Sequence, residues 1–134
     1  MKKDQPNVVI YFTDDQGYGD LSCMGAKDFS TPVLDRMANE GIRFTDWYSN
    51  SPVCSPSRAS LLSGKYPSRA GVRSILRGHR TATGLPPSTK TIASVLKSNG
   101  YQTAITGKWH LGLKDECRPH NHGFDKTFGF FAGC

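Results

Sequence analysis

Short apolar blocks, separated by polar and glycine-containing segments, predict alternating strands and helices in the first part of the chain. The run Val-Val-Ile-Tyr-Phe within residues 7–13 is apolar on both faces, as in a central strand of a covered sheet. A helix is predicted from Pro32 to Gly41, and residues 42–48 predict a second strand. The inward face of that helix is expected to consist of Leu34, Met37 and Ala38. The β-α-β order predicts a parallel pair with a right-handed crossover, unless the second strand pairs at an edge.

The stretch at residues 54–64, with the sequence Cys-Ser-Pro-Ser-Arg-Ala-Ser-Leu-Leu-Ser-Gly, predicts a second helix that begins at Pro56. Ser55 is expected at its N-cap and Pro56 at its first position, because a residue before proline avoids the α conformation. Gly64 is expected to end this helix. Its inward-facing residues are expected to be Leu61 and Leu62.

The remaining pattern predicts one long connection, one helix and one strand. Residues 66–90 are rich in Gly, Pro, Ser and Arg without periodicity, which predicts a surface connection near the functional site. Thr89 or Thr91 is expected to cap a helix that ends at Gly100, and residues 101–106 alternate as a strand does. The inward face of this helix is expected to be Ile92, Val95 and Leu96.

Composition indicates an ordinary globular protein. The chain has 134 residues, of which 37% are hydrophobic and 21% charged, and no apolar run is long enough to span a membrane. The net charge of +6 comes from scattered cations, and the densest basic run, residues 69–80, has no interleaved aromatic residues. This argues against nucleic-acid binding and suits an acidic substrate.

The cysteines, histidines and N-terminal residues argue against several kinds of site and segment. Four cysteines without CxxC spacing give neither a zinc site nor a disulfide framework. His120 and His122 lack partners at metal spacing and are interpreted as loop residues. The Met-Lys-Lys start resembles a signal peptide, but no apolar core follows. The chain as written is therefore expected in the cytoplasm, or exported if an upstream signal was removed.

Chemically capable residues follow two of the predicted strands. Asp14 and Asp15 come after the first strand, where ligands collect in open α/β sheets, and they can share a cation if the backbone turns there. An Asx-type turn with solvated carboxylates is the alternative. Lys108 and His110 follow the last strand, and in an extended segment they lie on one side, so both can contact one anion.

Cys54 is the third candidate, and three interpretations compete. It is expected just outside the second helix, with free amides beside it and Arg58 on the first turn, which favours an anion. It could be a buried thiol that only packs, or a thiolate nucleophile toward phosphate esters. Such nucleophiles usually have an arginine six positions later, where this chain has Ser60.

The third interpretation is a resemblance. Cys-x-Pro-Ser-Arg followed by Leu-Ser-Gly resembles the signature of type I sulfatases of the arylsulfatase and carbohydrate-sulfatase group, in which the cysteine is oxidised to formylglycine. Residues 7–20, 46–64, 107–112 and 122–125 also resemble stretches of that family, so the similarity covers essentially the whole chain. It implies an alkaline-phosphatase-like α/β/α sandwich with a mostly parallel central sheet, of which residues 1–134 would be the N-terminal part.

The resemblance also implies roles for the candidate residues. Asp14, Asp15 and Cys54 would be ligands of Ca²⁺, with Mg²⁺ as an alternative, and Cys54 would be the formylglycine precursor. Lys108 and His110 would contact formylglycine and sulfate. Arg58 would hold formylglycine and the metal.

The activity implied is hydrolysis of an aryl or carbohydrate sulfate ester. The expected partners are a sulfated small molecule or glycan and a formylglycine-generating or anaerobic sulfatase-maturing enzyme. Three protein ligand positions fall short of the six to eight oxygens that calcium prefers, so the 134 residues alone are expected to be nearly inactive. A phosphonate or phosphate ester hydrolase of the same superfamily and a non-catalytic truncated paralogue are the alternatives.

Overall fold

The computed structural model describes residues 5–77 and 83–133. The Met-Lys-Lys start, the His79 and Arg80 end of the basic run, and Cys134 lie outside the described residues. The chain divides into two compact units, Met1–Trp47 and Tyr48–Cys134, which are called the N-terminal and C-terminal units and are described one at a time. No helix within the described residues is long and apolar enough to cross a membrane.

The N-terminal unit contains the 3-10 helix η1, Ser22–Met24, and the helix α1, Pro32–Glu40. The predicted helix is thus confirmed, with Pro32 in its first turn and Gly41 directly after it. The Asp35 carboxylate ties α1 to η1, because it accepts hydrogen bonds from the Ser22 hydroxyl at 2.8 Å and the Cys23 amide at 2.9 Å. The predicted inward face of α1 is wrong within this unit, since no residue of α1 is buried.

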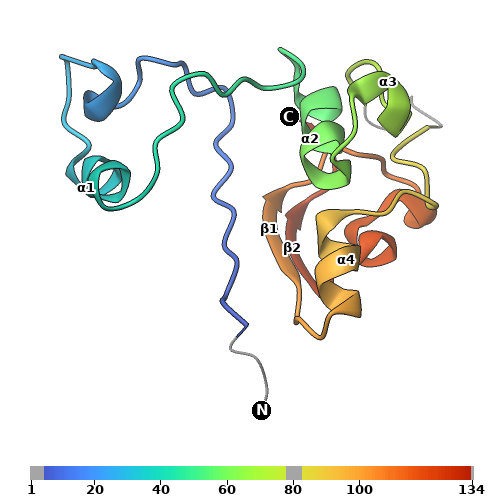
Figure 1. The fold of residues 1–134 in the computed structure, drawn as a ribbon. Coiled ribbons are helices and arrows are strands. Elements are labelled where there is room, and N and C mark those ends of the chain that lie inside the picture. Colours follow the sequence, from blue (N-terminus) through green and yellow to red (C-terminus); the bar gives the residue numbers. More distant parts are fainter. Residues whose placement is uncertain (1–4, 78–82, 134) are drawn as a thin grey trace. The chain divides into compact units, whose positions relative to one another are not determined.

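The two strands predicted at residues 7–13 and 42–48 are wrong, because neither segment forms a strand in the structure. Residues 7–13 run as a long segment without helical turns (Figure 1). Val9 and Tyr11 are 88% and 85% exposed. A strand needs a neighbouring backbone to pair with, and the described residues offer none to this segment. The predicted β-α-β unit is therefore absent from the described part of the chain.

The C-terminal unit is an α/β structure, which confirms that part of the predicted fold class. It contains, in chain order, α2 (Cys54–Ser63), α3 (Pro67–Ala70), α4 (Ile92–Ser98), β1 (Ala104–Lys108), η3 (Asp115–Cys117), η4 (Pro119–His122) and β2 (Lys126–Phe130). The strands β1 and β2 are parallel and lie side by side, with Ala104 opposite Lys126 and Lys108 opposite Phe130 (Figure 1).

β1 begins three residues later than predicted and runs to Lys108. Before it, Thr103 is held by Asp125, whose carboxylate accepts from the Thr103 amide at 3.0 Å and hydroxyl at 2.9 Å. Near its end, Gly107 pairs with Gly129, where a Cβ would lie 2.1 Å from the Gly107 oxygen. Only glycine fits at position 129, and β2 was not foreseen from the sequence.

The segment predicted as a surface connection supplies much of the core. Four of its residues, Ala70, Val72, Leu76 and Leu85, are buried together with Ala59, Ala93, Trp109, Leu111 and Phe124. The expectation for residues 66–90 is therefore wrong about burial. These apolar residues are spaced irregularly among Gly and Pro, so no helical or strand period marked them as core.

The third predicted helix is confirmed as α4, with Thr91 rather than Thr89 as its cap. Thr91 and Ser94 form a capping box, in which each side chain accepts from the other residue's amide. The predicted inward face is corrected, because Ile92 and Val95 are exposed and Ala93 is buried. Gly123 presses against the α4 backbone there, and this close approach favours a small residue.

Candidate active site

α2 begins two residues earlier than predicted. Val53, in an extended conformation, is the N-cap, and the carbonyl of Val53 accepts the first helical hydrogen bond from Ser57 at 3.2 Å. Pro56 is tolerated there because its missing N–H belongs to the first turn, whose amides have no helical partner. Cys54 is thus the first residue of the helix and is half-buried, rather than outside it. Gly64 ends the helix in the left-handed conformation, as predicted.

The inward face of α2 also differs from the prediction. Leu61 is exposed and Leu62 is only partly buried, whereas the buried residues are Ser55, Pro56, Ala59 and Ser60. Small side chains on this face allow α2 to lie close to the neighbouring chain. The first turn of the helix is therefore held firmly against the rest of the C-terminal unit.

Lys108 and Arg58 meet at the Cys54 side of this turn. The Lys108 ammonium lies 3.5 Å from the Cys54 Sγ. The Arg58 guanidinium, one turn further along α2, donates to the Lys108 carbonyl oxygen at 2.6 Å. The end of β1 is thus joined to the start of α2 by two contacts, and two cationic side chains lie beside the helix N-terminus. Such a place stabilises negative charge.

His110 is connected to the same turn of α2 through the backbone of Leu76. The backbone is left-handed at His110, with φ of 55°, so the extended geometry behind the prediction does not apply to it. The buried His110 ring makes a 2.9 Å hydrogen bond through Nε2 to the Leu76 carbonyl oxygen. The Leu76 amide donates to the Ser55 hydroxyl at 3.1 Å. Sequence reasoning singled out neither Leu76 nor the Ser55 side chain for this role.

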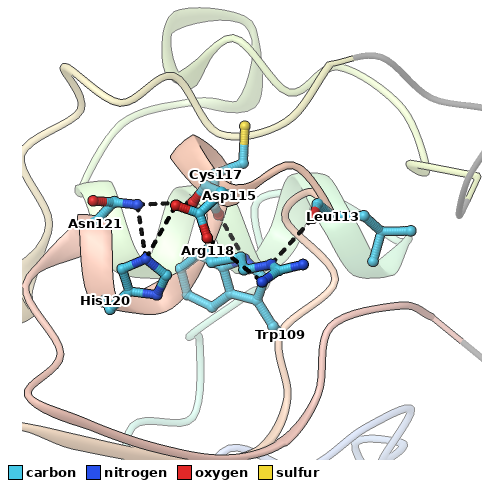
Figure 2. A network of polar contacts seen from close by, with 7 residues as sticks. All are labelled: Trp109, Leu113, Asp115, Cys117, Arg118, His120 and Asn121. Carbon is cyan, nitrogen blue, oxygen red and sulfur yellow. Dashed lines mark hydrogen bonds and ion pairs between the residues drawn. The ribbon is translucent and has the colours of Figure 1, made fainter.

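The segment after His110 is fastened by a polar network (Figure 2). The Trp109 indole donates to the Cys117 carbonyl oxygen at 2.9 Å, and the Arg118 Nε donates to the Leu113 carbonyl oxygen at 3.2 Å. His120 lies in this network, with its Nε2 3.6 Å from an Asp115 carboxylate oxygen. These contacts fix the chain on the C-terminal side of the candidate site.

His122 is a core residue rather than the loop residue that was predicted. It is fully buried, and its ring packs on Trp109 with centroids 5.7 Å apart. Burial lowers the pKa of His122, so the ring stays neutral and acts as an apolar filler. The burial of His122 against Trp109 could not be predicted from the sequence, because the two residues do not belong to one helical or strand repeat.

Asp14 and Asp15 belong to the N-terminal unit, whereas Cys54 belongs to the C-terminal unit. The backbone does turn at Asp15, where φ is 55°, as two adjacent carboxylates sharing one cation would require. Within the described residues, no group of three His, Cys, Asp or Glu side chains could hold a metal ion. Their role as calcium ligands stays a prediction.

Comparisons with known proteins find a matching family and relatives. The Sulfatase family model matches residues 6–133. Mouse steryl-sulfatase is 44% identical over 92% of this chain, which corresponds to 22% of that protein. The chain therefore spans under a third of the length of such relatives.

Solved structures extend the likeness to the fold. A Bacteroides thetaiotaomicron structure, from work on the metabolism of multiple glycosaminoglycans, matches 97% of this chain and 29% of its own, with TM-score 0.88 and 38% identity. BT4656 in complex with its substrate D-glucosamine-2-N,6-O-disulfate matches 92% of this chain and 23% of its own, with TM-score 0.78 and 35% identity. The predicted alkaline-phosphatase-like α/β fold is thereby confirmed.

Proposed function

Because the chain belongs to the sulfatase family, we propose that the protein hydrolyses sulfate esters at the first turn of α2. The observation that carries this proposal is the Lys108 ammonium 3.5 Å from the Cys54 Sγ, at a helix N-terminus. A sulfate ester gathers negative charge on its oxygens as the ester bond breaks, and fixed cations beside it lower that barrier. Lys108 would bind the sulfate, and Arg58 would hold Lys108 in place through its carbonyl.

Cys54 fits the role of formylglycine precursor. Its side chain is half-buried, starts a helix and lies next to a cation, so an oxygen in place of Sγ would face Lys108. Hydrated formylglycine supplies one hydroxyl that attacks sulfur and a second that allows the sulfate to be released. The chain's own contribution is orientation, because α2 fixes the position of residue 54 and Lys108 fixes the direction from which an anion arrives.

Calcium, or magnesium in its place, would be held by Asp14, Asp15 and residue 54. Carboxylate oxygens are the ligands that these hard cations prefer, and the turn at Asp15 suits two adjacent carboxylates. The ion would supply additional fixed positive charge at the sulfate. With three ligand positions for an ion that takes six to eight oxygens, we expect the 134 residues alone to bind calcium weakly.

The substrate would be a sulfated glycan or a sulfated small molecule. BT4656 has a doubly sulfated glucosamine as its substrate, which favours a sulfated sugar, whereas the relation to steryl-sulfatase favours an apolar alcohol. A formylglycine-generating or anaerobic sulfatase-maturing enzyme would be required as a partner to oxidise Cys54.

Because the 134 residues alone are expected to be nearly inactive, the test is to produce the whole protein that carries them together with a maturing enzyme and to assay an aryl sulfate and an aryl phosphonate. Formylglycine lowers the mass of the Cys54 peptide by about 18 Da relative to cysteine. We expect this loss, faster turnover of the sulfate, and no turnover by Cys54→Ala. Cys23→Ala is the matched control, since Cys23 is another half-buried free thiol, and it should stay active. Faster turnover of the phosphonate, or an active Cys54→Ala variant, would refute the proposal.

A further inference from the structure

Two consecutive hydrogen bonds connect the first turn of α2 to the His110 ring. The Ser55 side chain is fully buried, and its hydroxyl accepts from the Leu76 amide at 3.1 Å. The carbonyl of the same residue, Leu76, is 2.9 Å from His110 Nε2. Ser55 therefore fixes the peptide segment that His110 binds, although the two residues are far apart in sequence.

The second of these two hydrogen bonds determines which ring nitrogen of His110 carries the proton. A carbonyl oxygen can only accept, so His110 Nε2 must be the donor toward Leu76. His110 Nδ1 is buried and has no hydrogen-bond partner among the described residues. A ring that carries its single proton on Nε2 leaves an acceptor at Nδ1.

The backbone of His110 shows that this orientation is imposed by its surroundings. A φ of 55° is unfavourable for a residue with a large side chain, and it persists only where neighbouring contacts hold it. The His110 amide donates to the Phe131 carbonyl oxygen at 3.1 Å. Gly133 packs so closely on the ring that a Cβ there would lie 2.6 Å from Cε1. The hydrogen bond to Leu76 then determines which nitrogen of the ring carries the proton.

We propose that Ser55 is a positioning residue, which holds the backbone of Leu76 so that His110 keeps its proton on Nε2 and presents Nδ1 as a proton acceptor. This inference rests on the proposed function for its catalytic meaning, since His110 is one of the residues expected to contact formylglycine and sulfate. The arrangement itself can be tested without activity. Ser55 would not touch the substrate, so its loss affects turnover rather than binding.

The first test is ¹⁵N NMR of the protein labelled in its histidine rings, with the His110 signals assigned by their loss in His110→Gln. We expect the wild type to carry the proton on Nε2 of His110. Ser55→Ala should raise the share of the Nδ1-protonated form by roughly two- to tenfold, the effect of one hydrogen bond. Ser60→Ala is the matched control, because it removes a buried hydroxyl of the same helix that has no partner among the described residues.

Either of two results would overturn the proposal. One is a wild-type His110 protonated on Nδ1, which requires no variant to fold. The other is a Ser55→Ala protein whose His110 tautomer matches that of Ser60→Ala. Ser55→Thr, which keeps the hydroxyl, should restore the wild-type tautomer.

A kinetic test separates this inference from the proposed function. In the whole protein that carries these residues, with turnover normalised to the formylglycine content of the residue 54 peptide, Ser55→Ala should lower kcat by roughly two- to tenfold and leave KM unchanged. An unchanged kcat would overturn the positioning role. A wild type that matures but cleaves no sulfate ester would instead refute the proposed function, while the tautomer measurement still decides the role of Ser55.

Discussion

Trp109 lies between Lys108 and His110, so weakening its anchor tests whether the candidate site depends on the core beneath it. The indole is 2% exposed and donates to the Cys117 carbonyl oxygen at 2.9 Å. It packs edge-on against Phe124 with ring centroids 6.1 Å apart. Trp109→Phe keeps an aromatic ring but removes the N–H donor and part of the buried volume.

The structure allows the cost of Trp109→Phe to be estimated. A buried carbonyl left without its donor costs about 1–3 kcal/mol. The smaller ring leaves a gap that costs about 1 kcal/mol more, a fraction of what truncation of an aromatic residue to alanine costs. We therefore expect the free energy of unfolding to fall by about 2–4 kcal/mol, which is a large share of the stability of a small domain.

The assay is chemical denaturation followed by circular dichroism, because the substitution removes one of only two tryptophans and so alters fluorescence. Trp47→Phe is the matched control, since Trp47 is 74% exposed, and it should change stability by less than about 0.5 kcal/mol. If both variants lost the same small amount of stability, the Trp109 side chain would not anchor the segment. In the whole matured protein that carries these residues, sulfatase activity should fall with Trp109→Phe and persist with Trp47→Phe.

Three further predictions concern the contacts that hold α4 and β1. Gly123→Ala should lower the free energy of unfolding by more than about 2 kcal/mol, because φ is 94° and a Cβ would lie 2.3 Å from the α4 backbone. Gly64→Ala is the control; it has open space around it and should lower the free energy of unfolding by only about 1–2 kcal/mol. Equal shifts of the melting temperature in the two variants would contradict this. Thr91→Ala removes the capping box and should lower the free energy of unfolding, measured by denaturant titration, by about 1–2 kcal/mol. An unchanged denaturation midpoint would exclude the cap as a source of stability. The hydrogen bond from Lys97, the largest cause, lowers the pKa of Asp125 from 3.8 to about 2 in the folded state, so its contribution is present above about pH 4 and is lost as the pH falls toward 2. Asp125→Asn should flatten the pH dependence of the unfolding midpoint in that range, and a variant as acid-sensitive as the wild type would refute this assignment.

Local sequence signals predicted several helix boundaries correctly, although the start of α2 was misplaced and α3 was missed. Pro32 and Gly41 bracket α1, Gly64 ends α2, and Thr91 caps α4, because each of these residues acts through its own backbone or its nearest amides. Lys108 was also correctly expected at the end of a strand. Such features need no knowledge of the rest of the fold.

Features that depend on distant contacts were missed or misplaced. The buried face of α4 follows from the close approach of Gly123, and burial of Leu76 and Leu85 follows from residues after 100 that cover them. β2 was missed because a five-residue strand with two exposed phenylalanines shows no clear alternation. The Ser55, Leu76 and His110 connection joins residues more than a helix length apart, which no local pattern encodes.

The geometry of α2 also decides between two interpretations of Cys54 that the sequence left open. A thiolate that attacks phosphate esters usually relies on an arginine six positions later. In an α-helix, a residue six positions on lies about 240° around the axis from the first, whereas one four positions on lies within about 40° of it. Ser60 accordingly lies on the buried face, 4% exposed, while Arg58 reaches the Lys108 carbonyl beside Cys54.

In this helix, the side chain at position 58, and not the one at position 60, therefore lies where it can contact an anion bound at Cys54. An arginine placed at position 60 would be buried in the core instead of reaching the thiol. Ser60→Arg should for this reason unfold or strongly destabilise the protein without gaining phosphatase activity. A folded Ser60→Arg variant that hydrolysed an aryl phosphate through the Cys54 thiol would show that residues 54–60 can wrap around an anion as a loop, contrary to the helix that the structure shows.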